Sequence, residues 1–88
     1  MGNRIDFSSV DLSGCNSVLI QTRDITRQKT NLAIEKLQEM GIGNITVIST
    51  GVNPNIKEKI KNGEFHAILL LTARGKIVPH KKLRNLIA

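Results

Sequence analysis

The chain has 88 residues, of which 40% are apolar, and carries a formal net charge of +6. This length suits one domain with one modest core. The longest apolar run, residues 67–71, is far shorter than the roughly 20 residues that a membrane-spanning helix needs. A single cysteine excludes an intramolecular disulfide and a multi-cysteine metal site. We therefore expect one cytoplasmic domain over residues 1–88, with no membrane contact.

The excess positive charge is concentrated in the last third of the chain. Residues 1–56 hold five basic and five acidic side chains, whereas residues 57–88 hold eight basic and two acidic ones. Residues 74–88 form a basic C-terminal segment without an acidic side chain. Such a segment is typical of surfaces that contact an anionic partner, most often nucleic acid. It is also compatible with a solvated tail that only keeps the protein soluble.

The first half of the chain predicts two strands joined by a helix. Residues 17–22 have a continuous, β-branched apolar centre, which favours a strand buried on both faces. Residues 26–40 place apolar side chains at three- and four-residue spacing and are followed by Gly41, which is typical of a helix and its end. Asp24 or Thr26 is expected to cap this helix. Residues 45–49 predict the second strand.

The second half continues the same alternation. Asn53-Pro54 is a strong helix start. Asn caps the free N–H groups of the first turn, and the missing N–H of Pro costs nothing at the first helical position, where an N–H has no partner within the helix. Gly63 is expected to end this short helix. Residues 66–72 are the most apolar stretch, so we expect the central strand there. The basic segment is expected to be helical from Pro79.

The resulting order, β-α-β-α-β-α, predicts an α/β fold with a small three-stranded parallel sheet, since helical connections of this length make right-handed crossovers. Leu19, Val47 and Leu69 are expected to be buried. Residues 5–7 could add a short N-terminal edge strand. Few helices cover this two-sided sheet, so a partner or a second copy could shield what remains.

Ligands of open parallel sheets bind beyond the carboxyl ends of the strands. Three loops meet there, at residues 22–27, 49–53 and 72–76, and two helix N-termini point to the same edge, where they attract anions. The candidate residues for binding an anion or nucleic acid, at this edge and in the basic segment, are Arg23, Arg27, Arg74, Lys76, Lys81, Lys82 and Arg84.

No catalytic or metal-binding constellation is recognisable. His66 and His80 are fourteen residues apart, with no cysteine or carboxylate at the spacing of a zinc site. His66 is expected to be structural, and His80 to add charge to the basic segment. No basic residue flanks Cys15 in the sequence to activate its thiol, and Ser49 lacks an identifiable general base. We expect no enzyme activity, no cofactor and no metal.

Three passages resemble the catalytic domains of serine recombinases, the resolvase and invertase family: residues 23–37, 49–55 and 60–70. In that family an arginine and a nucleophilic serine end the first strand and precede a helix with spaced Gln and Leu residues. Arg23 and a segment with Gln28, Leu32 and Leu37 stand in these places here. The serine is missing, since Ile25 lies two residues past the arginine. The resemblance therefore implies a degenerate, truncated relative that binds DNA and does not cut it.

These observations together predict a non-catalytic domain that binds an anionic partner, foremost the phosphates of DNA or RNA, through its basic C-terminal third. Two phenylalanines are the only aromatic residues, which argues against base stacking and for salt-sensitive phosphate contacts. Two alternatives stay open. One is a protein-interaction or regulatory module, a homodimer included, that uses a sheet edge or a helix face. The other is a small phosphate-ligand binder at the carboxyl ends of the strands.

Overall fold

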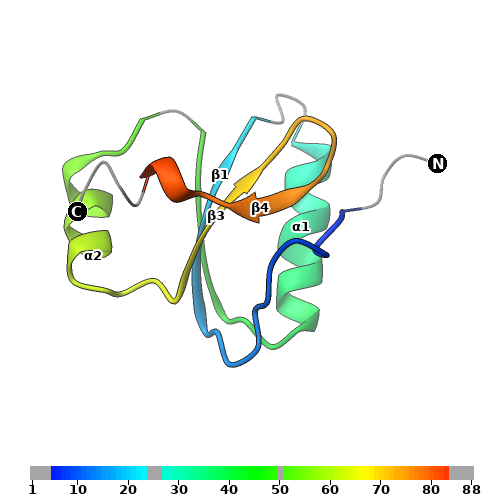
Figure 1. Ribbon diagram of the computed structural model, residues 1–88, viewed down its shortest axis with the longest axis horizontal. Helices are drawn as coiled ribbons and strands as arrows, with labels where there is room; N and C mark the ends of the chain where they lie inside the picture. The colour runs from blue at the N-terminus through cyan, green and yellow to red at the C-terminus, as the bar shows by residue number, and fades with distance from the viewer. Residues whose placement is uncertain (1–4, 24–26, 50, 84–88) are drawn as a thin grey trace.

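The computed structural model describes residues 5–23, 27–49 and 51–83. Within these ranges a mixed sheet lies between two helices (Figure 1). The elements in chain order are β1 (Ser17–Thr22), α1 (Gln28–Glu39), β2 (Asn44–Ile48), α2 (Pro54–Lys61), β3 (Ala67–Leu71) and β4 (Ile77–Pro79). Residues 81–83 add one short helical turn. None of the described helices is long and apolar enough to cross a membrane.

The sheet has four strands in the order β2-β1-β3-β4. β1 pairs in parallel with both β2 and β3, and Ile20 lies opposite Val47 on one side and Leu69 on the other. The α/β class and the parallel pairing of the three expected strands are confirmed. The prediction of a three-stranded sheet is wrong, because β4 pairs antiparallel with β3. Among the parallel strands β1, and not the more apolar β3, takes the middle place.

A tight turn after β3 explains the strand that the sequence analysis missed. The N–H of Thr72 donates to the Lys76 carbonyl at 2.9 Å, and the Thr72 hydroxyl accepts from the Lys76 N–H at 3.1 Å. Gly75 supports the reversal with a φ of 86°, which glycine adopts without strain. The chain therefore folds back as a hairpin and buries Ile77. A helix from Pro79 is wrong, since that residue belongs to β4.

The expected N-terminal edge strand is reduced to a single bridge. Asp6 pairs in parallel with Lys76, and its N–H and carbonyl bond to Gly75 and Ile77, each at 2.9 Å. The segment then leaves the sheet and packs Phe7 against the core on the α1 side. This N-terminal segment thus partly covers the outer side of β4.

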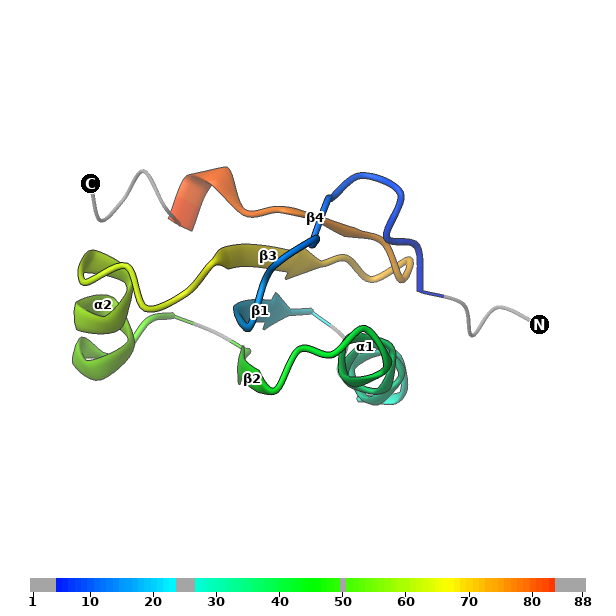
Figure 2. The ribbon, with the colours of Figure 1, turned by 90° about the horizontal axis from the view of Figure 1, so that it is seen from below.

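The two helices cover opposite faces of the sheet (Figure 2). The core on the α1 face comprises Val18, Ile20, Ala33, Leu37, Ile42, Leu69, Leu71 and Ile77. The core on the α2 face comprises Leu19, Ile56, Phe65, Ile68 and Leu83. Leu19 and Leu69 are buried as expected, but Val47 is 37% exposed, because β2 is the outermost strand and α1 only partly covers it.

Replacing Leu37 by Ala is expected to destabilise the domain strongly. Leu37 is fully buried between α1 and the sheet, so its truncation should lower the free energy of unfolding by about 2–5 kcal/mol. The neighbouring exposed residue Gln38 provides a control. Gln38→Ala should change the free energy of unfolding by less than about 0.5 kcal/mol. Urea unfolding followed by circular dichroism measures both. Equal effects of the two substitutions would contradict this packing.

Candidate anion-binding edge

The carboxyl ends of β1, β2 and β3 point to one edge of the sheet, at the top of Figure 1. Five basic residues lie at this edge: Arg23, Arg27, Lys29, Arg74 and Lys76. We call these five residues the basic edge. The Lys29 ammonium group donates to the carbonyl of Ala73 at 2.6 Å, and the N–H of Arg23 donates to Leu71 at 3.3 Å. These contacts hold the start of α1, the end of β1 and the β3–β4 turn together.

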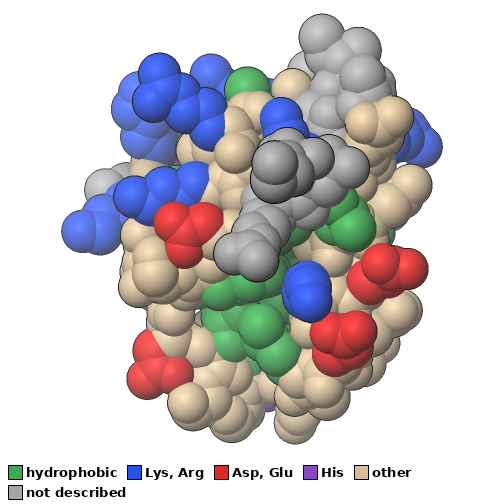
Figure 3. Space-filling view, turned by 90° about the vertical axis from the view of Figure 1, so that its right-hand side faces the viewer, with side chains coloured by type: hydrophobic (Ala, Val, Ile, Leu, Met, Phe, Trp, Pro, Cys, Tyr) green, Lys and Arg blue, Asp and Glu red, His purple; other side chains and the backbone are tan. Residues whose placement is uncertain are grey.

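Carboxylates of the described residues leave the basic edge largely uncompensated. Within residues 5–23, 27–49 and 51–83 one ion pair forms, between Lys36 and Glu39 at 3.7 Å in α1. Figure 3 shows most Lys and Arg side chains of the α1 side in its upper half, with the Asp and Glu side chains at its middle and lower part. On the face shown in Figure 3, positive and negative side chains are thus concentrated towards different ends of the parallel strands.

The carboxylate of Asp6 lies close enough to the basic edge to interact with the positive charge of Lys76. The hydroxyl and the N–H of Ser8 lower the pKa of Asp6, and the positive charge of Lys76 lowers it further. The N–H of Ser8 donates to Asp6 Oδ1 at 2.8 Å. Asp6 is thus held as an ionised neighbour of one end of the basic edge and, among the described residues, does not form an ion pair with it.

The start of α1 is unusual for a helix. Its N-cap residue is Arg27, which has a φ of 64°, and its side chain makes no capping hydrogen bond. A positive φ is uncommon for a residue with a side chain other than Asn or Asp. The first turn of α1 contains no acidic residue, although negative charge stabilises this end of a helix. The caps predicted from the sequence, Asp24 and Thr26, lie outside the described residues.

The start of α2 is satisfied internally, as the sequence predicted. Asn53 caps the helix through its Oδ1, which accepts from the Ile56 N–H at 2.8 Å, and Pro54 occupies the first helical position. Of the two helix N-termini expected to attract anions, only that of α1 lacks a cap from its N-cap side chain. The contact between Lys29 and Ala73 joins α1 to the β3–β4 turn, so the candidate site centres there.

The predicted binding residues divide into three groups in the structure. Arg23, Arg27, Arg74 and Lys76 belong to the basic edge. Lys81 and Lys82 follow β4 and lie beyond it, so the basic segment 74–88 does not form one continuous helical surface. Arg84 lies outside the described residues.

Two further basic side chains at this end of the sheet escaped the sequence analysis. Lys29 belongs to the first turn of α1, and Lys57 lines a depression of about 400 Å³ together with Lys82, Gly51 and Gln21. The available signal was positional, because both lysines closely follow a loop at the carboxyl end of a parallel strand. Their local sequence carries no binding motif.

His80 connects the short C-terminal turn to the sheet. Its Nδ1 accepts from the Leu83 N–H at 3.3 Å, and its Nε2 bonds to the side-chain oxygen of Gln21. Since Nδ1 accepts, the proton of the neutral ring lies on Nε2 and is donated to Gln21. Burial lowers the pKa of His80, and the positive charges of Arg23 and Lys82 lower it further. The expectation that His80 adds charge is therefore wrong at neutral pH.

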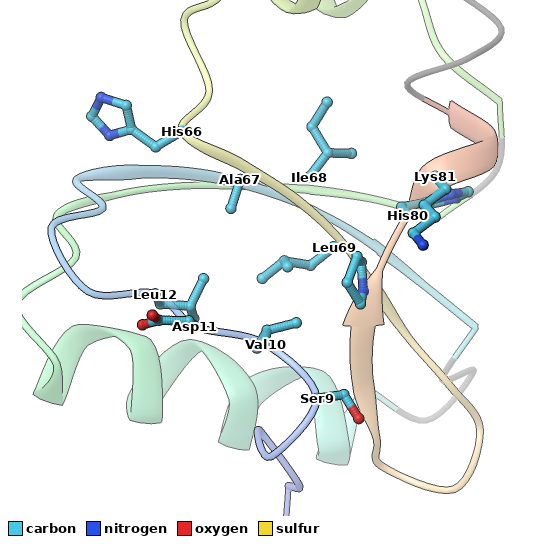
Figure 4. A pocket seen from close by; sticks show the side chains of 11 residues that line it. Ser9, Val10, Asp11, Leu12, His66, Ala67, Ile68, Leu69, His80 and Lys81 are labelled. Atoms are coloured by element: carbon cyan, nitrogen blue, oxygen red, sulfur yellow. The ribbon is translucent and has the colours of Figure 1, made fainter.

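The two histidines line one depression of about 320 Å³ without meeting. Figure 4 shows their rings at opposite ends, with the apolar side chains of Val10, Leu12 and Leu69 between them. His66 Nδ1 accepts from the N–H of Asn16 at 2.9 Å, in keeping with a structural role. No group of three His, Cys, Asp or Glu residues that could hold a metal occurs in the described part of the chain.

The stability of the domain is expected to fall in mild acid because of His80. Below about pH 6.5, the ordinary pKa of histidine, the unfolded chain binds a proton that the folded protein binds only at lower pH. The contribution of neutral His80 to the stability of the fold is therefore complete above about pH 6.5. It is lost as the pH falls through the lower pKa that His80 has in the folded protein. His80→Asn retains an oxygen that can accept from Leu83 but does not titrate.

Thermal unfolding of the wild type and His80→Asn between about pH 8 and pH 5 measures this dependence. The melting temperature of the wild type should fall more steeply with acidification than that of the variant. Both proteins contain His66, so any contribution from that residue cancels from the comparison. Parallel curves would show that His80 is not held neutral by these contacts.

No family model, curated protein or solved structure matches this chain. The resemblance to serine recombinases stays an expectation based on sequence. Arg23, which it singles out, lies directly after β1 at the carboxyl edge of the sheet, whereas Ile25 lies outside the described residues. The function is accordingly inferred from the geometry and charge of the basic edge.

Proposed function

We propose that this protein binds the phosphates of nucleic acid at its basic edge and catalyses no reaction. The observation that carries the proposal is the convergence of Arg23, Arg27, Lys29, Arg74 and Lys76 from distant parts of the chain, without a carboxylate at ion-pair distance among the described residues. Mutual repulsion of such side chains is unfavourable in the free protein, and a polyanion would relieve it.

The surroundings of the basic edge favour contacts to the nucleic acid backbone over contacts to bases. Phe65 is buried and Phe7 is half-buried in the core, and the chain has no other aromatic residue. A stacking platform of the kind found in single-strand binders is therefore lacking. Binding of this type is strongly salt-dependent and discriminates little between sequences.

A small phosphate-bearing ligand is the second candidate. The depression of about 400 Å³ beside the basic edge is lined by Lys57, Lys82, Gly51 and the apolar side chains of Val52 and Leu83. Ligand sites of this size typically combine an apolar wall with a few polar groups. The two candidates differ in which lysines bind, since Lys57 and Lys82 lie outside the basic edge.

Removing two charges from the β3–β4 turn is expected to weaken nucleic acid binding. In the double variant Arg74→Gln, Lys76→Gln, the slope of log affinity against log salt on duplex DNA should become flatter by about 0.9 for each phosphate that the protein no longer neutralises. The decrease in affinity should be similar for duplexes of unrelated sequence. Fluorescence anisotropy with a labelled duplex at several salt concentrations measures both quantities.

A matched control removes the same charge elsewhere. Lys59 and Lys61 are exposed in the last turn of α2, so Lys59→Gln, Lys61→Gln changes the net charge equally while leaving the basic edge intact. Equal decreases in affinity for the two double variants would indicate attraction by net charge alone. Failure of the wild type to bind DNA or RNA at low salt would refute the proposal.

A further inference from the structure

The two edges of the sheet differ in how well they are protected. β4 has three residues, ends in Pro79 and is flanked by Asp6 of the N-terminal segment. β2 lies at the other edge and, within the described part of the chain, pairs on one side only, with β1. Its sequence, NITVI, contains no proline, glycine or charged residue. Proteins usually blunt such edges with charges, prolines or bulges, because an open edge pairs readily with another strand.

An apolar strip accompanies the open edge. Val47 is 37% exposed, and Ile34 of α1 is half-buried. Both line a depression of about 360 Å³ whose other lining residues are polar and include Arg27. In the register with β1, Ile45 and Val47 lie opposite Val18 and Ile20, whose side chains belong to the core on the α1 face. The strip therefore runs along the side of the β2 edge that α1 partly covers.

We propose that two copies of this chain associate through β2 about a two-fold axis. Symmetric pairing of one edge strand with itself is antiparallel and joins the four strands of each copy into one continuous sheet. With the axis at Thr46, Ile45 lies opposite the partner's Val47, and Thr46 lies opposite the partner's Thr46. Cross-strand pairs of β-branched residues are favourable in such a ladder.

Charge makes a second copy the fitting occupant. β2 carries no charge, so two chains of net charge +6 meet there without like charges opposite each other. The two-fold arrangement sets α1 of one copy antiparallel to α1 of the other on the same face. Basic residues begin this helix at Arg27 and Lys29. Its second half holds Glu35, Glu39 and Lys36, a net charge of −1. The basic start of each helix thus faces the more acidic end of its mate.

The first test places a charge on the strip. Val47→Lys at the exposed edge position should weaken dimerisation by about tenfold or more, since an unpaired charge then lies beside the partner's Ile45 on the α1 face of the joined sheet. Asn62→Lys adds the same charge at the exposed end of α2 and should leave dimerisation unchanged. Sedimentation velocity over a concentration series, without nucleic acid, measures association. Circular dichroism establishes whether each variant is folded.

The second test locates the axis and holds even if the charged variant does not fold. In a Cys15→Ser background, Thr46→Cys should form an intermolecular disulfide on mild oxidation, because the axis sets the two cysteines opposite each other. Val78→Cys on β4 should not. A strictly monomeric wild type, or equal cross-linking at both edges, would overturn the proposal. If the wild type is monomeric, the β2 edge is instead available to pair with a strand of another protein. Neither assay depends on the proposed binding of nucleic acid.

Discussion

Burial of β1 on both of its faces is the constraint on which the rest of the molecule depends. Val18, Leu19 and Ile20 are essentially inaccessible to solvent, and their side chains alternate between the two cores. A strand of this kind needs a neighbour on either side and a helix on each face. β2 and β3 take the neighbouring places, and α1 and α2 cover the faces (Figure 2). The basic edge is a consequence, because both helices then start where the parallel strands end.

The hairpin of β3 and β4 adds the remaining part of that edge. Its turn returns the chain to the carboxyl ends of the strands and places Arg74 and Lys76 beside the start of α1. The buried hydrogen bond between the hydroxyls of Thr22 and Thr30, 2.7 Å long, fixes α1 against β1 at the same end. These hydrogen bonds hold the backbone that bears the basic side chains in place before a ligand binds. Binding therefore loses less conformational entropy than it would if the basic residues lay on a flexible segment.

The two surfaces that we propose to be functional lie on different sides of the molecule. The basic edge lies at the ends of the strands, whereas the β2 edge runs along one of them. Antiparallel pairing through β2 places the two basic edges at opposite ends of the joined sheet. An assembly of this kind would engage two nucleic acid segments, or two distant stretches of one, with a gain in avidity set by their spacing.

Local signals in the sequence determined most elements and their ends. The Asn53-Pro54 start of α2 was predictable because capping acts within one helical turn, and the apolar runs predicted three strands because burial on two faces leaves a continuous pattern. Strand order, the antiparallel β4 and the exposure of Val47 were decided only by the tertiary structure. The tertiary structure alone also decided the hydrogen bonds of Lys29 to Ala73 and of His80 to Gln21. These contacts join residues far apart in the chain, and sequence periodicity reports which face of an element is buried but not which element covers it.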